Sequence, residues 1–322
     1  MLTAQTLAEW ARELGFADMG MCPADDFRHS QHLVESQKPL AERRQLRFCP
    51  KDDTPEIRSI AVLLWPYAPA QDSREAAVFV DSYYAASNAA YHAARSLEAK
   101  MLEAGCFARA NVSYPAKEAA IRAGMGVIGR NSLLITPKYG SRVVIILVAT
   151  GIELPQTLSL HQKRDCLGCG RCIKACPSGA LDENGMSHPE RCLRNFIMEG
   201  VVVPENLRKG IGSRLIGCDT CQRVCPMQRS NTQFERSKYT LDEFITEDAT
   251  EFSKAAGRLA DEIGRNAARP QRIRAQAALL AGNSGQKRYL PVLENWSNMP
   301  FPAVSEHARW AIQQIESSAE QT

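Results

Sequence analysis

The sequence predicts a multidomain chain of mixed α and β structure (α+β), and three observations support this class. The 322 residues suffice for two or three domains at roughly 100–200 residues each. Helical patterns alternate with short apolar runs before residue 155, whereas residues after 240 carry helical patterns alone. Between these regions lie eight of the eleven cysteines. We expect domains at residues 1–155, 156–232 and 233–322.

Four elements define the first predicted domain. Residues 4–14 have amphipathic helical spacing, and an alanine-rich helix is expected over 82–104. The near-continuous apolar runs at 59–65 and 142–148 predict buried strands. Helices alternating with buried strands predict an α/β sandwich.

The last domain is predicted to be helical. Residues 271–280, 289–296 and 304–315 have helical spacing and are separated by prolines. Such helices stack as a repeat unit, and one unit alone cannot bury its apolar face. We therefore expect the tail to dock on the cysteine-rich domain.

Composition limits the class of protein. With 44% hydrophobic and 23% charged residues, the chain is typical of globular proteins. The apolar run at 143–149 is shorter than the ~18–20 residues of a membrane helix. The first residues include Glu9 and Glu13 and lack an apolar core with a cleavage site, so we expect no signal peptide. We expect a cytoplasmic monomer without a membrane partner, and a net charge of +3 is too small to imply nucleic acid by itself.

The cysteines follow a known spacing. The first run is C-x2-C-x2-C-x3-C-P, the pattern of two-cluster bacterial ferredoxins, in which the fourth cysteine serves the other cluster. Its members are Cys166, Cys169, Cys172 and Cys176, followed by Pro177. Gly168 and Gly170 permit unusual backbone dihedrals where the chain would wrap a cluster.

A second run repeats the later part of this pattern. It contains Cys218, Cys221 and Cys225, with Leu215 where a further cysteine is expected. Cys192 is the one other cysteine nearby in the sequence. Eight thiolates then serve two [4Fe–4S] clusters: Cys166, Cys169, Cys172 and Cys225 for the first, and Cys176, Cys192, Cys218 and Cys221 for the second.

Two other uses of these cysteines are zinc binding and disulfide formation. Structural zinc also takes four cysteines, but the tight run ending in Cys-Pro favours iron–sulfur clusters. A disulfide framework does not fit the expected reducing compartment. Cys22, Cys49 and Cys106 are expected to be small buried hydrophobic residues.

Residues 124–129 match the pattern GxGxxG. The dinucleotide-binding motif requires a strand before these glycines and a helix after them. Here a helical stretch at 116–123 precedes them and a strand-like stretch at 133–136 follows. We therefore expect a loop that closely approaches another large ligand, or a tight turn, and not a nicotinamide site.

Several segments together resemble the epoxyqueuosine reductases and related corrinoid iron–sulfur proteins. They are residues 123–141, the paired cysteine motifs with Cys192, residues 211–212 before Cys218, and the helical residues 272–283 and 307–311. The resemblance implies a nitroreductase-like α/β core that binds base-off cobalamin, a bacterial-ferredoxin-like double-cluster domain that reduces the cobalt, and C-terminal HEAT-like helices. It also implies reduction of epoxyqueuosine to queuosine in tRNA and an electron donor of flavodoxin or ferredoxin type.

The same resemblance suggests cofactor contacts in the glycine loop. They are Gly126, Gly129, Arg130, Asn131, Ser132 and Ser141. The chain departs from the family at its proton-donating Asp, whose position is occupied by Val112. Because an expelled epoxide oxygen must be protonated, the candidates are Tyr114 and Lys117; the alternative is that both are ordinary surface residues.

Other functions remain open. The order Pro115-x-Lys117 is closer to relatives that include reductive dehalogenases, so the substrate is alternatively a small molecule or a corrinoid protein. A further alternative is a non-catalytic electron-transfer or tRNA-binding module. Basic residues either form a phosphate-binding strip or a solvated face balanced by acids; they are Arg208, Lys209, Arg214, Arg223, Arg229, Arg265, Arg269, Arg272 and Arg274.

Overall fold

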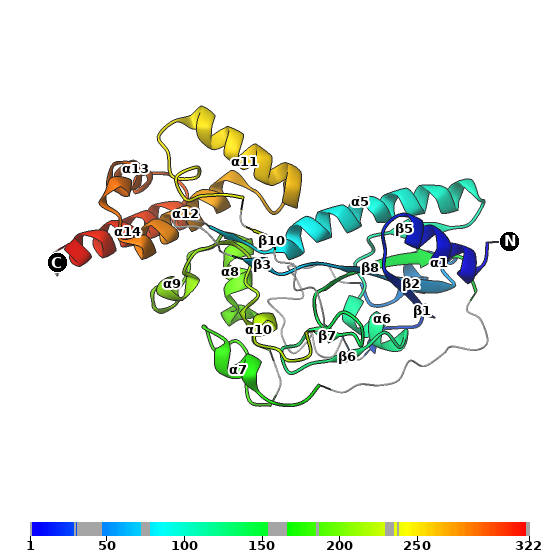
Figure 1. Ribbon diagram of the computed structural model, residues 1–322. Helices are drawn as coiled ribbons and strands as arrows, with labels where there is room; N and C mark the ends of the chain where they lie inside the picture. The colour runs from blue at the N-terminus through cyan, green and yellow to red at the C-terminus, as the bar shows by residue number, and fades with distance from the viewer. Residues whose placement is uncertain are drawn as a thin grey trace. The chain divides into compact units, whose positions relative to one another are not determined.

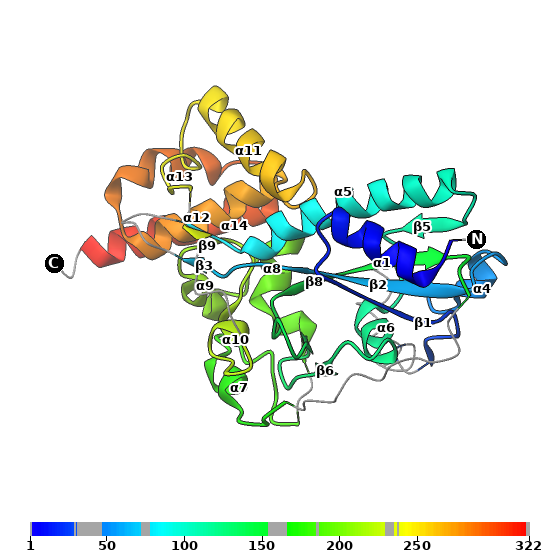
Figure 2. The same cartoon turned by 45° about the vertical axis from the view of Figure 1, so that its right-hand side comes forward.

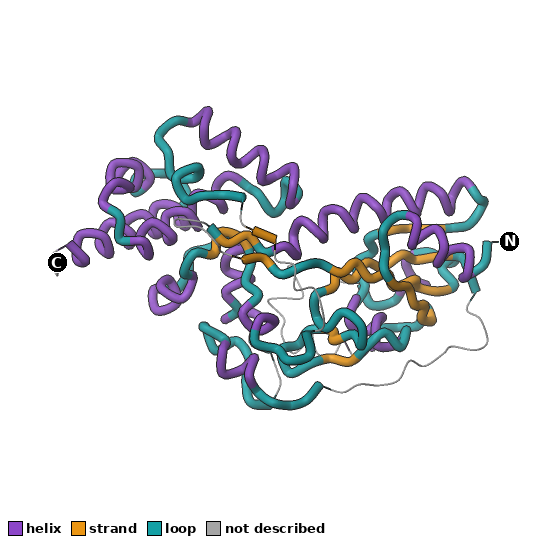
Figure 3. The backbone as a smooth tube through the Cα atoms, viewed as in Figure 1, coloured by secondary structure: helices purple, strands orange, loops and turns teal. Residues whose placement is uncertain are grey.

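The computed structural model describes residues 2–28, 30, 47–71, 78–153, 166–184, 187–228, 235–236 and 238–319. The chain forms two compact units that each combine separate stretches of sequence. The first contains Met1–Tyr67, Ala86–Gly170 and Cys225–Ser230; the second contains Ala68–Ala85, Arg171–Val224 and Asn231–Thr322. Figure 3 shows a mixture of helices and strands, as the predicted class requires. The division at residues 155 and 232 stays a prediction.

The first unit is built on a four-stranded sheet in the order β1-β2-β8-β5, and every neighbouring pair is antiparallel. The strands are β1 (Asp18–Pro23), β2 (Ser59–Pro66), β8 (Val143–Thr150) and β5 (Ala108–Ala110). The two predicted strands are confirmed as β2 and β8, which lie side by side with Ile60 opposite Ala149. Short hydrophobic runs therefore marked the centre of the sheet.

Both faces of this sheet are covered. Ile60, Val62 and Leu64 of β2 pack in one core with α6 (Ala116–Arg122). The alternate residues, Ala61 and Leu63, are also fully buried and point to the opposite face. On that face lie α1 (Ala4–Glu13) and α5 (Ser82–Glu103), of which residues 86–103 belong to this unit (Figures 1 and 2). A strand buried on both faces has no polar alternation, which explains its continuous apolar run.

Two small elements complete the described part of the first unit. The short helix α4 (Pro50–Asp53) precedes β2, and an antiparallel hairpin follows α6, formed by β6 (Val127–Ile128) and β7 (Leu134–Ile135). The glycines therefore lie between a helix and a hairpin, which is not the context of a dinucleotide motif.

The second unit is mainly helical. Its helices are α7 (Arg171–Ala175), α8 (Leu193–Glu199), α9 (Glu205–Ile211), α10 (Thr220–Arg223), α11 (Ala249–Ile263), α12 (Pro270–Ser284), α13 (Leu290–Trp296) and α14 (Pro302–Ala319), with 3-10 turns at Pro189–Arg191 and Lys287–Tyr289. Two short parallel pairs join β4 (Phe79–Val80) to β9 (Arg214–Ile216) and β3 (Ala70–Gln71) to β10 (Glu235–Arg236). The three predicted tail helices are confirmed as α12, α13 and α14.

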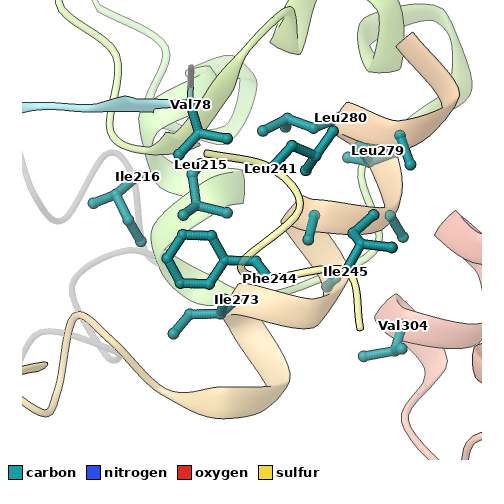
Figure 4. Close-up of a cluster of buried hydrophobic side chains, with 14 of the residues drawn as sticks. Val78, Leu215, Ile216, Leu241, Phe244, Ile245, Ile273, Leu279, Leu280 and Val304 are labelled. Atoms are coloured by element: carbon teal, nitrogen blue, oxygen red, sulfur yellow. The ribbon is translucent and has the colours of Figure 1, made fainter. Parts of the chain in front are cut away.

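One apolar core holds this unit together. Ile273 and Leu279 of α12 and Val304 of α14 pack in the same cluster as Leu215 and Ile216 of β9 (Figure 4). The tail helices thus bury their apolar faces against the segment that carries the second cysteine run, as expected. The described helices include none with the length and apolar character needed to cross a bilayer.

Candidate functional site

The four predicted ligands of the second cluster lie near one another within the second unit. Burial is the largest cause that raises the pKa of the Cys221 thiol above its ordinary value. Neighbouring thiols raise it further, in the order Cys218, Cys192, Cys176 and Cys172. The sequence had assigned the first three of these neighbours to the same cluster as Cys221 and had assigned Cys172 to the first cluster. Cys172, predicted to bind the first cluster, therefore lies close enough to affect the pKa of Cys221, which is predicted to bind the second cluster.

Three predicted ligands of the first cluster lie together in the first unit. The pKa of Cys225 is raised by burial and, more weakly, by the nearby Cys166 and Cys169 thiols. The backbone N–H groups of Met227 and Gln228 hydrogen-bond to the Cys225 sulfur and act in the opposite direction. Cys169 is exposed and Cys166 is half-buried, so this thiol group is close to solvent.

The donor set is made of thiols that a bound cationic group would stabilise. A ligating cysteine must be a thiolate, yet burial raises the thiol pKa of Cys192, Cys221 and Cys225 and so opposes their ionisation. A bound cationic group removes that conflict, because it stabilises several thiolates at once.

The backbone near the first cysteine run has the predicted conformation. Gly168 and Gly170 have φ values of 65° and 70°, a left-handed region that glycine enters at little cost. The cysteines outside the runs carry no comparable grouping. Cys22 is buried as expected, whereas Cys49 and Cys106 are only half-buried.

The glycine loop is a tight turn in its own right. A Cβ atom on Gly126 would lie 2.3 Å from the carbonyl oxygen of Ile135, and one on Gly129 would lie 2.5 Å from the Ile135 Cδ1 atom. Both contacts are within the β6–β7 hairpin, so close packing of the hairpin itself requires these glycines. Ser132 adopts a φ of 57° at the turn.

The loop is bonded at both ends to segments that carry cysteines of the first run and Cys225. Arg130 Nη1 donates to the carbonyl of Gly168 at 3.0 Å. Gln228 Nε2 donates to Ser141 Oγ at 2.6 Å. All four residues belong to the first unit. A molecule held by residues 126–141 would therefore lie close to Cys166, Cys169 and Cys225.

Two buried polar atoms in this region point to a missing partner. Asn131 is 5% exposed, and its Nδ2 finds no hydrogen-bond partner among the described residues. The Oε1 atom of Gln228 is in the same situation within the described ranges. Because an unpaired buried polar group is costly, both atoms fit a site completed by a polar ligand or ordered water.

The two candidate proton donors have different surroundings. Tyr114 is 4% exposed, stacks on Phe27 at 5.9 Å between ring centroids, and donates its hydroxyl to Asp53 Oδ2 at 2.7 Å. Burial and this hydrogen bond raise the pKa of Tyr114 above its ordinary value, so it is a poor acid. The alternative that Tyr114 is a surface residue is wrong, because the β-sheet core encloses its ring.

Lys117 is exposed, and its Nζ donates to the carbonyl of Ser132 at 2.6 Å. It is therefore attached to the candidate cofactor loop. Val112, which the sequence predicts to occupy the position of an Asp, packs partly buried against the apolar core of the first unit, and its side chain has no acidic proton.

Most of the predicted basic residues make contacts within the second unit. Five of them donate to protein oxygens: Arg208, Arg214, Arg223, Arg269 and Arg272. The guanidinium of Arg274 lies 3.9 Å from the centroid of the Phe252 ring, and Arg229 lies outside the described residues. A groove of about 790 Å³ at the ends of α9, α12 and α14 is lined by Lys209, Lys287 and Asn283 among others.

Comparisons with known proteins agree with this arrangement. Residues 165–228 match the model of the 4Fe-4S double cluster binding domain, a range that contains all eight predicted ligands. The epoxyqueuosine reductase of Pseudomonas aeruginosa is 28% identical over 96% of this chain and 93% of its own length. That of Listeria monocytogenes is 32% identical over 61% of this chain.

The chain is thus similar to the epoxyqueuosine reductases over nearly its whole length. A crystal structure of epoxyqueuosine reductase with a tRNA-Tyr epoxyqueuosine-modified stem loop has a TM-score of 0.79 at 24% identity, covering 98% of this chain and 92% of that one. This likeness establishes a shared fold. The chain spans 53% of the length of the Listeria relative and 28% of that from Bacillus cereus, which is 38% identical over 34% of this chain.

Proposed function

We propose that this chain is a cobalamin-dependent iron–sulfur reductase that converts epoxyqueuosine in tRNA to queuosine. The observation that carries the proposal is the pair of hydrogen bonds that join the glycine loop to segments carrying predicted cluster ligands, Arg130 to Gly168 and Gln228 to Ser141. A reductase of this kind needs its electron-delivering and cofactor-binding groups close together. The near full-length relationship to a curated epoxyqueuosine reductase supports the same activity.

The cysteines would hold the electron-transfer groups. Two [4Fe–4S] clusters supply one-electron transfer when they are bound. We assign Cys166, Cys169, Cys172 and Cys225 to one cluster and Cys176, Cys192, Cys218 and Cys221 to the other. The exposure of Cys169 favours the first cluster as the place where an external donor of flavodoxin or ferredoxin type would approach.

The glycine loop would hold the cobalamin, whose cobalt supplies a strongly reducing centre when bound. Arg130 and Ser141 fix the two ends of the loop, while the unpaired Nδ2 of Asn131 is a donor available to a polar group of the cofactor. Gly126 and Gly129 shape the hairpin, and Ser132 forms its turn. Their role is thus to set the loop conformation.

Lys117 is the better candidate for holding the proton that the departing oxygen requires. Its ammonium group is exposed and lies beside the loop, whereas the Tyr114 hydroxyl is committed to Asp53. A lysine ammonium in place of a carboxylic acid is the main chemical departure of this chain from its family. Because of this departure, a small molecule is the second candidate for the substrate.

For the fold, we propose a nitroreductase-like core, a ferredoxin-like cluster region and HEAT-like tail helices.

For tRNA binding, Lys209 and Lys287 in the groove of the second unit are candidate phosphate contacts. A cytoplasmic monomer remains our expectation.

The test is anaerobic reconstitution with iron, sulfide and cobalamin, followed by incubation with tRNA from a reductase-deficient strain. We expect about eight iron atoms per chain, from two [4Fe–4S] clusters, together with bound corrinoid and conversion of epoxyqueuosine to queuosine by nucleoside mass spectrometry. Iron-loaded protein without corrinoid would overturn the cofactor assignment. Fully loaded protein that leaves epoxyqueuosine unchanged would overturn the tRNA substrate.

A further inference from the structure

A threonine hydroxyl contacts one cysteine of the second run. Thr220 Oγ1 lies 3.4 Å from Cys218 Sγ, within hydrogen-bond range for sulfur. The same oxygen receives a hydrogen bond from Arg214 Nη2 at 2.9 Å. Because a guanidinium group can only donate, Thr220 accepts from Arg214. A ligating cysteine is a thiolate and can only accept, so the Thr220 hydroxyl hydrogen is directed at the Cys218 sulfur.

The arginine in this relay is firmly held. Arg214 Nη1 donates to the carbonyl oxygens of Gly210 at 3.1 Å and Ile211 at 3.0 Å, at the end of α9. Its backbone belongs to β9, which pairs with Phe79 of β4. The guanidinium thus has few alternative positions, and it fixes the orientation of the Thr220 hydroxyl.

Other donors surround the same group of cysteines. Backbone N–H groups of Arg194 and Asn195 hydrogen-bond to the Cys192 sulfur. The guanidinium of Arg194 lies 5.5 and 5.6 Å from the ring centroids of Tyr83 and Tyr84, on the first turn of the helix that Cys192 precedes. The cluster site therefore combines sulfur hydrogen bonds with positive charge.

We propose that Thr220, oriented by Arg214, raises the reduction potential of the cluster held by Cys176, Cys192, Cys218 and Cys221. Reduction adds negative charge to the cluster and its sulfurs, and a hydrogen bond to a ligand sulfur stabilises that charge. Thr220 is a positioning residue that acts through Cys218 and touches no substrate. The inference rests on the proposed cluster assignment and is independent of cobalamin and tRNA.

The experiment is a redox titration of reconstituted full-length protein, with cluster signals followed by electron paramagnetic resonance. We expect T220V to shift one of the two cluster signals to lower potential and to leave the other unchanged. T220S keeps the hydroxyl group and should have the wild-type potential. R214Q should shift the same signal in the same direction by a smaller amount.

Controls separate this proposal from the cluster assignment. T250V replaces an exposed threonine at the start of α11 and should leave both potentials unchanged. Wild-type potentials in T220V, or equal shifts of both signals, would overturn the proposal. If T220V does not assemble its cluster, R214Q provides the test. A lower potential for one cluster in R214Q would support the proposal, and a wild-type potential would overturn it. Absence of [4Fe–4S] signals from the wild type would instead overturn the proposed function.

Discussion

At the residue scale, the proposed function makes Lys117 the side chain that holds the proton needed by the departing oxygen. We expect Lys117→Met to lower the rate of epoxyqueuosine reduction by roughly a hundredfold, the scale of general acid catalysis. Iron content and bound corrinoid should not change, because Lys117 is exposed and its Nζ donates to a backbone carbonyl, that of Ser132. Single-turnover assays under reducing conditions measure the effect.

Two matched variants test the assignment. Lys51→Met removes another exposed lysine of the first unit, one paired with Asp25 at 3.5 Å, and should leave the rate unchanged. Tyr114→Phe deletes the hydrogen bond to Asp53 and should cost about 1–2 kcal/mol of unfolding free energy while activity persists. Full activity in Lys117→Met combined with an inactive, cluster-loaded Tyr114→Phe would transfer the role to Tyr114.

At the element scale, hydrophobic pattern located the central strands and the tail helices but not their partners. Helix α11 lies where helical patterns are expected, but prolines alone do not delimit it, because it is bounded by an Asp248 N-cap and by Gly264. The N-cap side chain, which accepts from Thr250 and Glu251 N–H groups, was the available signal. Cysteine spacing, by contrast, predicted groupings that bring together residues far apart in sequence.

The contacts that define the site were beyond sequence reasoning. Gln228 meets Ser141 and Asp53 meets Tyr114 only because the folded core brings distant segments together. No periodicity or spacing rule relates such positions, since each pairing depends on the tertiary packing of the whole unit. The glycine loop is a similar case. The sequence shows the glycines at 126 and 129, but the close approach of Ile135 that requires them arises only in the folded hairpin.

A buried histidine of α14 links this helix to α12 and to the loop before α9, and it makes the stability of the second unit depend on pH. His307 is 0% exposed; its Nε2 accepts from Val203 N–H at 2.9 Å, so its Nδ1 carries the proton and donates to the Ala275 carbonyl at 2.9 Å. Burial, with a smaller effect from Arg208, lowers its pKa from 6.5 to about 4. The folded state therefore keeps His307 neutral where the unfolded chain is already protonated.

The sign of the effect follows from proton binding. Between pH 6.5 and 4 the unfolded state binds more protons, so stability falls as pH falls through that window. The loss should reach the order of 3 kcal/mol at its limit, measured as urea unfolding free energy at several pH values. His307→Gln should flatten this acid branch, whereas the exposed His92→Gln should retain it. Identical pH profiles for wild type and His307→Gln would contradict the prediction.

At the scale of the whole molecule, the apolar cores and the cysteine segments have separate sources of stability. Each unit has its own core, and the helices α12 and α14 and the strands β2 and β8 contribute much of them. Residues 166–184, in contrast, contain one helix of five residues and only three buried hydrophobic residues, Cys172, Ala180 and Leu181. We infer that bound clusters, and not apolar packing, hold this segment in place.

Removal of the clusters should therefore loosen the cysteine segment without unfolding the chain. We expect chelation under oxidising conditions, with thiols then re-reduced, to leave far-ultraviolet circular dichroism nearly unchanged, because the main helices lie in the cores. Trypsin should then cut after Arg171 and Lys174, both in α7, much faster than in the holoprotein. Mass spectrometry of the fragments locates the cuts, and protein re-loaded with iron and sulfide should recover its resistance. A cooperative loss of helical signal in step with iron release would contradict this separation, since it would mean that the cores depend on the clusters.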